Sequence, residues 1–165
     1  MSASAAMDAW MLRRIRLVLT LFIAGLALSG ITAFPLEWEL GLLSRWLDAD
    51  LAAPEGGLRW WIARVHDALT QSGNRYPFLA YGTDWLAFGH LVIALFFIGP
   101  WRDPVANAWV LRIGLVACVG VIPLALICGG IRGIPIYWRL IDCAFGIFGA
   151  LPLLYVLRLI RRCER

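Results

Sequence analysis

Residues 76–90 read YPFLAYGTDWLAFGH, and here the longest polar segment of the chain enters an apolar helix. Asp84 lies where this helix is expected to start, and His90 lies inside it. No charged residue follows between His90 and Pro100. We therefore expect a membrane span over residues 85–99, ended by Pro100 and preceded by an ordered loop over residues 76–83.

The rest of the chain has the composition of an integral membrane protein. Of its 165 residues, 61% are apolar and 16% are charged, and the mean hydropathy is +0.76. An ordinary soluble domain has roughly half its residues apolar and about a quarter charged. Nucleic acid is not expected as a partner, because the arginines lie at the ends of apolar runs and not on one polar face.

Four apolar runs predict membrane spans, at about residues 15–34, 85–99, 113–130 and 140–158. The third contains Pro123, which predicts a kink. A basic collar over residues 13–16 precedes the first run, and such a collar is also typical of a signal peptide cleaved near Ser29. The run continues to Phe34, which favours a span, and cleavage stays open. The predicted fold is one all-α domain over residues 1–165, a four-span transmembrane helical bundle.

Residues 35–83 form the segment between the first two spans. Apolar side chains recur at helical spacing twice, at Leu36, Leu40, Leu43 and Leu47 and at Leu58, Ile62, Val65 and Leu69. This pattern predicts two amphipathic helices, the second ended by residues 71–74. Neither is long enough to span. We expect both to lie on the outer face of the bilayer or to cap the bundle there, with their tryptophans among the lipid headgroups.

Charge distribution predicts the orientation. With the N-terminus inside, the inner segments carry nine of the 15 basic residues and three of the 11 acids, counting the tail through Glu164 and Arg165. Positive charge is enriched in cytoplasmic segments. We therefore expect both termini in the cytoplasm, residues 35–83 outside it, and a bacterial inner (cell) membrane as the location.

The predicted topology brings several ionisable residues to the outer ends of the spans. They are Asp84, His90, Arg132, Arg139 and Asp142. Ionisable groups at such depth usually face the bundle interior or a wet cavity. One hypothesis is an outer-face site that binds an anionic headgroup or relays a proton through histidine. The structural alternative is that the arginines reach the headgroups while the acids neutralise them or cap helices.

No catalytic or cofactor motif accompanies these residues, and no cofactor or metal ion is expected. The two histidines, His66 and His90, do not have the spacing of a haem or metal site. The four cysteines lack a Cys-x-x-Cys pair. Cys128 and Cys143 lie at similar predicted depth, so a disulfide stays open, although packing as small apolar residues is favoured. Cys163 is a weak candidate for acylation.

Small residues spaced by four predict close helix packing, either within the chain or against another subunit. They are Gly25, Ser29 and Ala33 in the first span and Asp142, Gly146 and Ala150 in the fourth. With short loops and no catalytic motif, this pattern favours a non-enzymatic accessory or scaffold subunit of a membrane complex. Its partners would be the bilayer and another protein or further copies of the chain. The alternative is a small membrane enzyme or transporter whose outer-face site binds a lipid headgroup or an anionic solute.

Overall fold

The computed structural model describes residues 8–163, apart from the side chain of Cys163. Helices make up 84% of the described residues, and no strand occurs within that range. Four helical segments are long and apolar enough to cross a membrane: Ala9–Ala33, Pro77–Arg102, Ala108–Ile131 and Ile136–Arg162. The all-α class and the four candidate spans are thus confirmed. Insertion in a bilayer and the bundle arrangement stay predictions, and the tail residues Glu164 and Arg165 lie outside the described residues.

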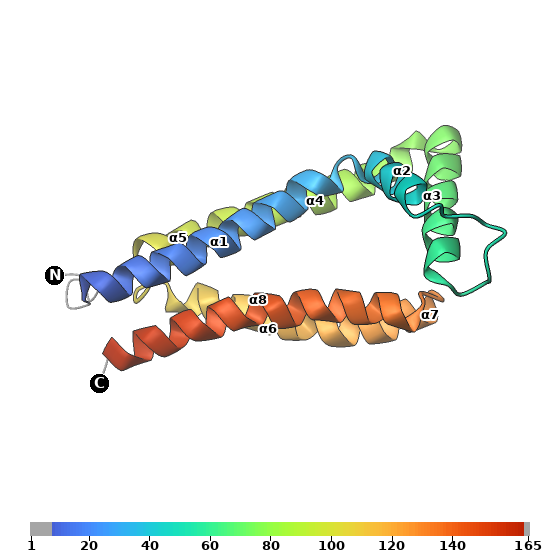
Figure 1. Ribbon diagram of the computed structural model, residues 1–165. Coiled ribbons are helices and arrows are strands. Elements are labelled where there is room, and N and C mark those ends of the chain that lie inside the picture. Colours follow the sequence, from blue (N-terminus) through green and yellow to red (C-terminus); the bar gives the residue numbers. More distant parts are fainter. Residues whose placement is uncertain (1–7, 164–165) are drawn as a thin grey trace. The chain divides into compact units, whose positions relative to one another are not determined.

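Figure 1 shows the elements in chain order. They are α1 (Ala9–Ala33), α2 (Leu36–Trp46), α3 (Leu58–Arg75), the short 3-10 helix η2 (Pro77–Leu79), α4 (Ala80–Phe96), α5 (Ile98–Arg102), α6 (Ala108–Pro123), the π-helical turn η3 (Leu124–Cys128), α7 (Gly129–Ile131) and α8 (Ile136–Cys163). The chain divides into two compact units. Unit 2 is Leu26–Val92, and unit 1 comprises the residues before and after it.

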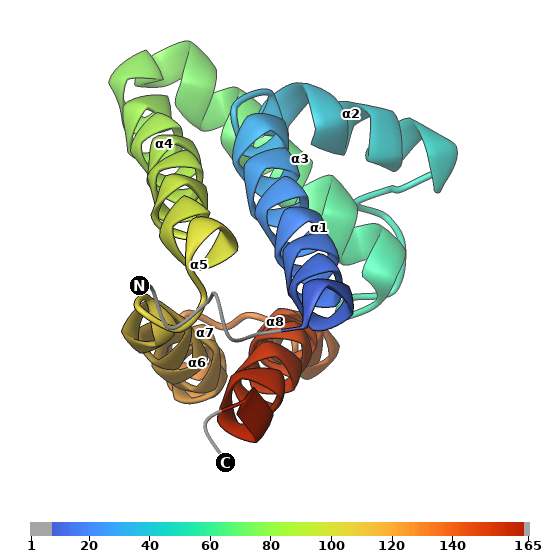
Figure 2. The same cartoon turned by 90° about the vertical axis from the view of Figure 1, so that its left-hand side faces the viewer.

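In unit 1, α6 and α8 lie side by side (Figures 1 and 2). Gly146 of α8 is buried, and a Cβ atom placed on it would lie only 2.5 Å from the carbonyl oxygen of Cys118 in α6. A Cβ atom on Gly149 would lie 3.0 Å from Sγ of Cys118. Glycines that let two helix backbones approach in this way are typical of membrane helix pairs. The small-residue face predicted around Gly146 therefore packs within the chain.

The first half of α1 also belongs to unit 1, where it packs on the segment around α5. The rings of Phe22 and Phe97 meet edge to face, with centroids 4.7 Å apart. Trp101 donates a hydrogen bond from Nε1 to Oγ1 of Thr20 at 3.0 Å, and the guanidinium of Arg16 lies 5.2 Å from the Trp101 ring. These aromatic and polar contacts hold the start of α1 against the turn after α4.

In unit 2, α1 and α4 approach most closely at Gly30. A Cβ atom there would lie 2.9 Å from the carbonyl oxygen of Ala87 and 3.1 Å from Cβ of His90. The predicted face of Gly25 and Ser29 is instead exposed, and Gly25 has no neighbouring atom within 4 Å of such a Cβ. Within the described chain, helix contact is therefore made by Gly30 and not by the Gly25 face.

Helices α2 and α3 form a hairpin at the end of unit 2, joined by residues 47–57. Leu40 of α2 and Ile62 of α3 are buried, with 8% and 1% of their surface exposed. The connection turns through positive φ angles at Asp48 (45°) and Gly56 (84°). Arg59 steadies it by donating hydrogen bonds from its guanidinium to the carbonyl oxygen of Asp48. The two helices have the places that the apolar repeats predicted, and their location on a bilayer surface stays a prediction.

Three predicted boundaries were wrong. Residues 71–74 do not end α3, which continues to Arg75 and has Gly73 in contact with Glu37 of α2. Residues 76–83 are not a loop, since a helical segment begins at Pro77, and proline is well suited to the first position of a helix. Pro100 does not end the second span. It falls in the first turn of α5, where its missing N–H would have had no partner within the helix.

Candidate functional site

The five residues predicted to form one outer-face site are divided between the two units. Asp84 and His90 lie on α4 in unit 2, while Arg132, Arg139 and Asp142 lie on unit 1. Each half is described below by its own contacts. Their assembly into one site stays a prediction.

His90 packs between α4 and α1. Its Nδ1 lies 2.8 Å from the carbonyl oxygen of Leu86, one turn earlier in α4, and is placed to donate a hydrogen bond to it. Its Cβ lies against Gly30 of α1. These contacts are what a histidine that fills a helix interface would make, and they leave Nε2 as the ring nitrogen free for another role.

Arg139 folds back over the irregular end of the third span. A Cβ atom on Gly129 would lie 2.7 Å from Cδ of Arg139, so the two glycines at 129 and 130 leave the room that this side chain occupies. Nη1 of Arg139 donates a hydrogen bond to the carbonyl oxygen of Leu126 in η3 at 3.4 Å. Nε of the same side chain is buried without a hydrogen-bond partner in the described structure. Within this half of the predicted site, Arg139 therefore supports the backbone of η3.

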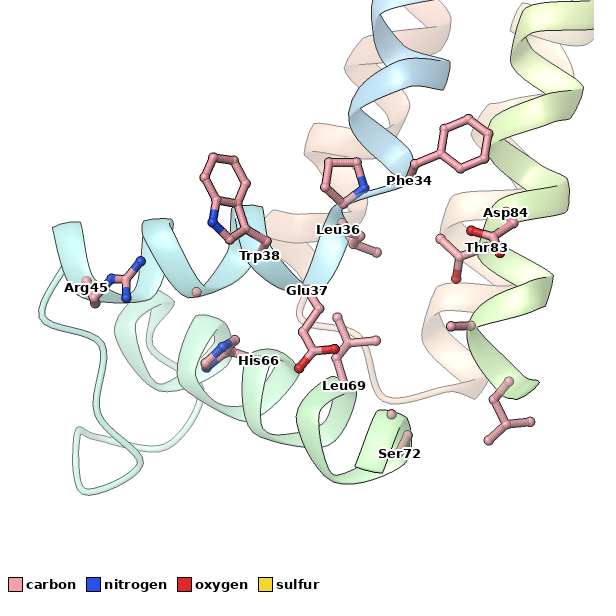
Figure 3. Close-up of a pocket in the computed structure, with 15 residues that line it drawn as sticks. Phe34, Leu36, Glu37, Trp38, Arg45, His66, Leu69, Ser72, Thr83 and Asp84 are labelled. Carbon is pink, nitrogen blue, oxygen red and sulfur yellow. The ribbon is translucent and has the colours of Figure 1, made fainter. Parts of the chain in front are cut away.

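A cleft that the sequence did not reveal lies in unit 2, with a volume of about 670 Å³. Its walls come from the turn after α1, from α2 and α3, and from the start of the second candidate span (Figure 3). Its polar lining consists of Glu37, Arg45, His66, Ser72, Thr83 and Asp84. Of the five predicted site residues, Asp84 is the one that lines it. A volume of this size lies within the usual range of small-molecule sites, about 300–1,000 Å³.

Two glycines set the width of this cleft. A Cβ atom on Gly41 of α2 would lie 3.1 Å from Nε2 of His66, and one on Gly73 of α3 would lie 3.2 Å from Oε2 of Glu37. Each helix thus has a glycine at the point where a polar side chain of the other helix packs against it. Glu37 of α2 and His66 of α3, which belong to the polar faces of their helices, therefore face the partner helix. The sequence could have indicated this part of the cleft, because Glu37 and Gly41 are four residues apart and therefore share one face of α2.

The charged groups of the cleft are available to a ligand. Glu37, Arg45, His66 and Asp84 make no side-chain hydrogen bond or ion pair with any residue in the described range. Asp84 and His66 are half-buried, whereas Glu37 and Arg45 are exposed. In Figure 3, Arg45 and Asp84 lie at opposite ends of the cleft, with His66 and Glu37 between them. The arrangement separates positive from negative charge along the cleft.

A smaller cleft of about 330 Å³ lies on the other side of His66, bordered also by Asp50, Asp67 and Thr70. Oγ1 of Thr70 is buried without a hydrogen-bond partner in the described structure. Asp67 accepts a hydrogen bond from Nε2 of Gln71 at 2.8 Å. Over residues 8–163, no three His, Cys, Asp or Glu side chains are placed to hold a metal ion.

The three cysteines whose side chains the structure describes, Cys118, Cys128 and Cys143, are free thiols. Cys128 is exposed and Cys143 is buried, with its Sγ 3.9 Å from the carbonyl oxygen of Ile122. The two do not form a disulfide. Cys143 packs as a small apolar residue, while the side chain of Cys163 lies outside the described structure.

Comparison of the chain with protein family models, curated proteins and solved structures finds no match.

Proposed function

We propose that this protein is a non-enzymatic accessory or scaffold subunit of a membrane complex. One observation carries the proposal: several glycines on the candidate spans have open space around them. A Cβ atom placed on Gly25 of α1, on Gly82 or Gly89 of α4, or on Gly120 of α6 would meet no atom within 4 Å. Gly82 and Gly89 are seven residues apart and share one face of their helix.

Glycine inside a helix is unfavourable by about 1 kcal/mol relative to alanine, so an exposed glycine needs a compensating contact. In membranes that contact is usually a second helix, because small residues let two backbones come close. The open glycines therefore support a surface for a helix of a partner protein. Association with further copies of this chain is the competing outcome.

Gly25→Leu tests this proposal, with Ala24→Leu as its matched control on the neighbouring, also exposed, position of α1. The complex is purified from native membranes in mild detergent, and co-purifying proteins are identified. We expect Gly25→Leu to lose the partner and Ala24→Leu to retain it, with both variants equally abundant in the membrane. Recovery of the wild-type chain as a partner-free monomer would contradict the proposal. Recovery as a pure oligomer would show that the partner is a further copy of this chain.

The cleft in unit 2 favours a second candidate function, a small membrane enzyme or transporter that binds its substrate at a polar outer-face site. Half-buried Asp84 and His66 have no partner among the described residues, as substrate-binding groups would not before the ligand arrives. Asp84→Asn and His66→Asn should then fail to complement a deletion strain while reaching normal membrane abundance. Equal loss of abundance and complementation would instead indicate a structural role.

A further inference from the structure

The cleft of unit 2 carries both signs of charge on groups without protein partners, and it opens where two candidate spans end. We propose that it binds a zwitterion made of a phosphate and an ammonium group, as in the headgroup of phosphatidylethanolamine. The inference deepens the second candidate function by naming its ligand class. It requires only that the cleft binds a ligand, whether or not reaction or transport follows.

The position of the cleft suits a lipid headgroup. Phe34, Leu79 and Ala80 all line the cleft. Phe34 lies directly after α1, and the other two lie at the start of the second candidate span. The ends of spans are the level of the headgroups. Trp38 also borders the cleft and is 63% exposed, with its ring on the side of α2 away from Glu37 and His66 (Figure 3); tryptophan is usual at headgroup depth.

The acidic end of the cleft suits an ammonium group. Glu37 and Asp84 supply carboxylates from α2 and α4, and Thr83 adds a hydroxyl (Figure 3). A carboxylate accepts strong, charge-assisted hydrogen bonds from an ammonium.

The other end suits a phosphate. His66 presents an imidazole whose nitrogens make no hydrogen bond to a described residue, and Arg45 supplies a guanidinium beyond it. Arginine matches the geometry of phosphate oxygens, and histidine can donate an N–H to them. Oε2 of Glu37 lies beside Gly73 of α3, whereas Nε2 of His66 lies beside Gly41 of α2, so the carboxylate and the imidazole occupy different points of the cleft.

This charge pattern discriminates between ligand classes. A purely anionic headgroup would leave Glu37 and Asp84 unpaired beside its negative charge, and a purely cationic ligand would leave Arg45 unpaired. A binding site discriminates most strongly against a ligand that would leave its polar groups unpaired or place a like charge beside them. A zwitterion pairs with all of them at once.

The test titrates the full-length, detergent-solubilised chain with dihexanoyl phosphatidylethanolamine and counts bound ligand by native mass spectrometry. Dihexanoyl phosphatidylglycerol is the anionic comparison. We expect the ethanolamine lipid to bind at least about tenfold tighter. Glu37→Gln and Asp84→Asn should each remove that preference by weakening its binding about tenfold or more. Glu39→Gln, on the same helix but outside the cleft, is the matched control and should bind like the wild type.

Free O-phosphoethanolamine distinguishes the source of the ligand. Binding equal to that of the lipid would support the zwitterion class and assign a soluble ligand, and weaker binding would support the lipid. Equal or tighter binding of the glycerol lipid would overturn the proposal, as would unchanged binding by Glu37→Gln, an isosteric change at an exposed position. If binding is lost in Asp84→Asn while the variant still complements the deletion, the second candidate function fails and the binding site stands.

Discussion

At the scale of single residues, Gly146 and Gly120 show how the same amino acid can have opposite roles on paired helices. Gly146 of α8 is buried against the backbone of Cys118, whereas Gly120 of α6 has open space around it. The first position has no room for a methyl group, and the second has room for any side chain. Helix propensity alone would favour alanine at both.

Gly146→Ala should therefore destabilise the protein by about 1–3 kcal/mol, because the added Cβ forces α6 and α8 apart. The measurement is thermal unfolding in detergent, where each kcal/mol shifts the Tm of a chain of this size by about 2–4 °C. Gly120→Ala is the control and should be neutral or raise stability by up to about 1 kcal/mol. Equal Tm values for the two variants would show that α6 and α8 do not pack through Gly146.

At the scale of elements, Pro123 predicted an irregular third span, and the irregularity takes the form of the π-helical turn η3. Pro123 cannot donate a backbone hydrogen bond, and the widened turn begins directly after it. The carbonyl oxygen of Leu126 in this turn accepts a hydrogen bond from Nη1 of Arg139. An arginine from the next helix thus supports backbone that the proline has disturbed.

Replacing this arginine should loosen the turn. In Arg139→Gln we expect the amides of residues 124–128 to exchange with deuterium about tenfold faster or more, since a hydrogen bond to a charged group contributes about 1.5–3 kcal/mol. Hydrogen exchange read by mass spectrometry checks this. Arg132→Gln is the matched control, because the exposed side chain of Arg132 makes no hydrogen bond within the described structure, and it should leave the rate unchanged. Equal acceleration by both variants would indicate a general effect of charge.

At the scale of the whole molecule, four candidate spans predict that the two ends of the chain lie on the same side of a membrane. The start of α1 and the end of α8 belong to unit 1 and lie at the same end of it (Figure 1). The charge distribution predicts the cytoplasmic side for both ends, because arginine is in excess over acid in the segments that this orientation places there.

Reporter fusions test the orientation. Green fluorescent protein after Arg165 should fluoresce, because it folds in the cytoplasm, and alkaline phosphatase inserted after Gly56 should be active, because that loop is expected outside it. The reciprocal fusions, with the reporters exchanged, should both be inactive. Activity of the exchanged pair would place the termini outside and move the cleft of unit 2 to the cytoplasmic face.

The sequence by itself determined the class of the protein and the number of helices able to span a membrane. Both follow from long apolar runs, because a bilayer core demands about 20 consecutive apolar residues whatever they pack against. Helix ends were less predictable. Pro77, Gly73 and Pro100 read as breaks, yet each occupies a position where a helix tolerates it.

Only the tertiary structure decided which polar residues meet. The repeats of α2 and α3 identified their apolar faces but not that Glu37 and His66, on their polar faces, face the partner helix. That pairing depends on Gly41 and Gly73, whose missing side chains admit His66 and Glu37. Asp84, first singled out beside His90, consequently lines a cleft with Glu37 and His66. Such a site depends on contacts between residues far apart in the chain, and local patterns of hydropathy do not encode them.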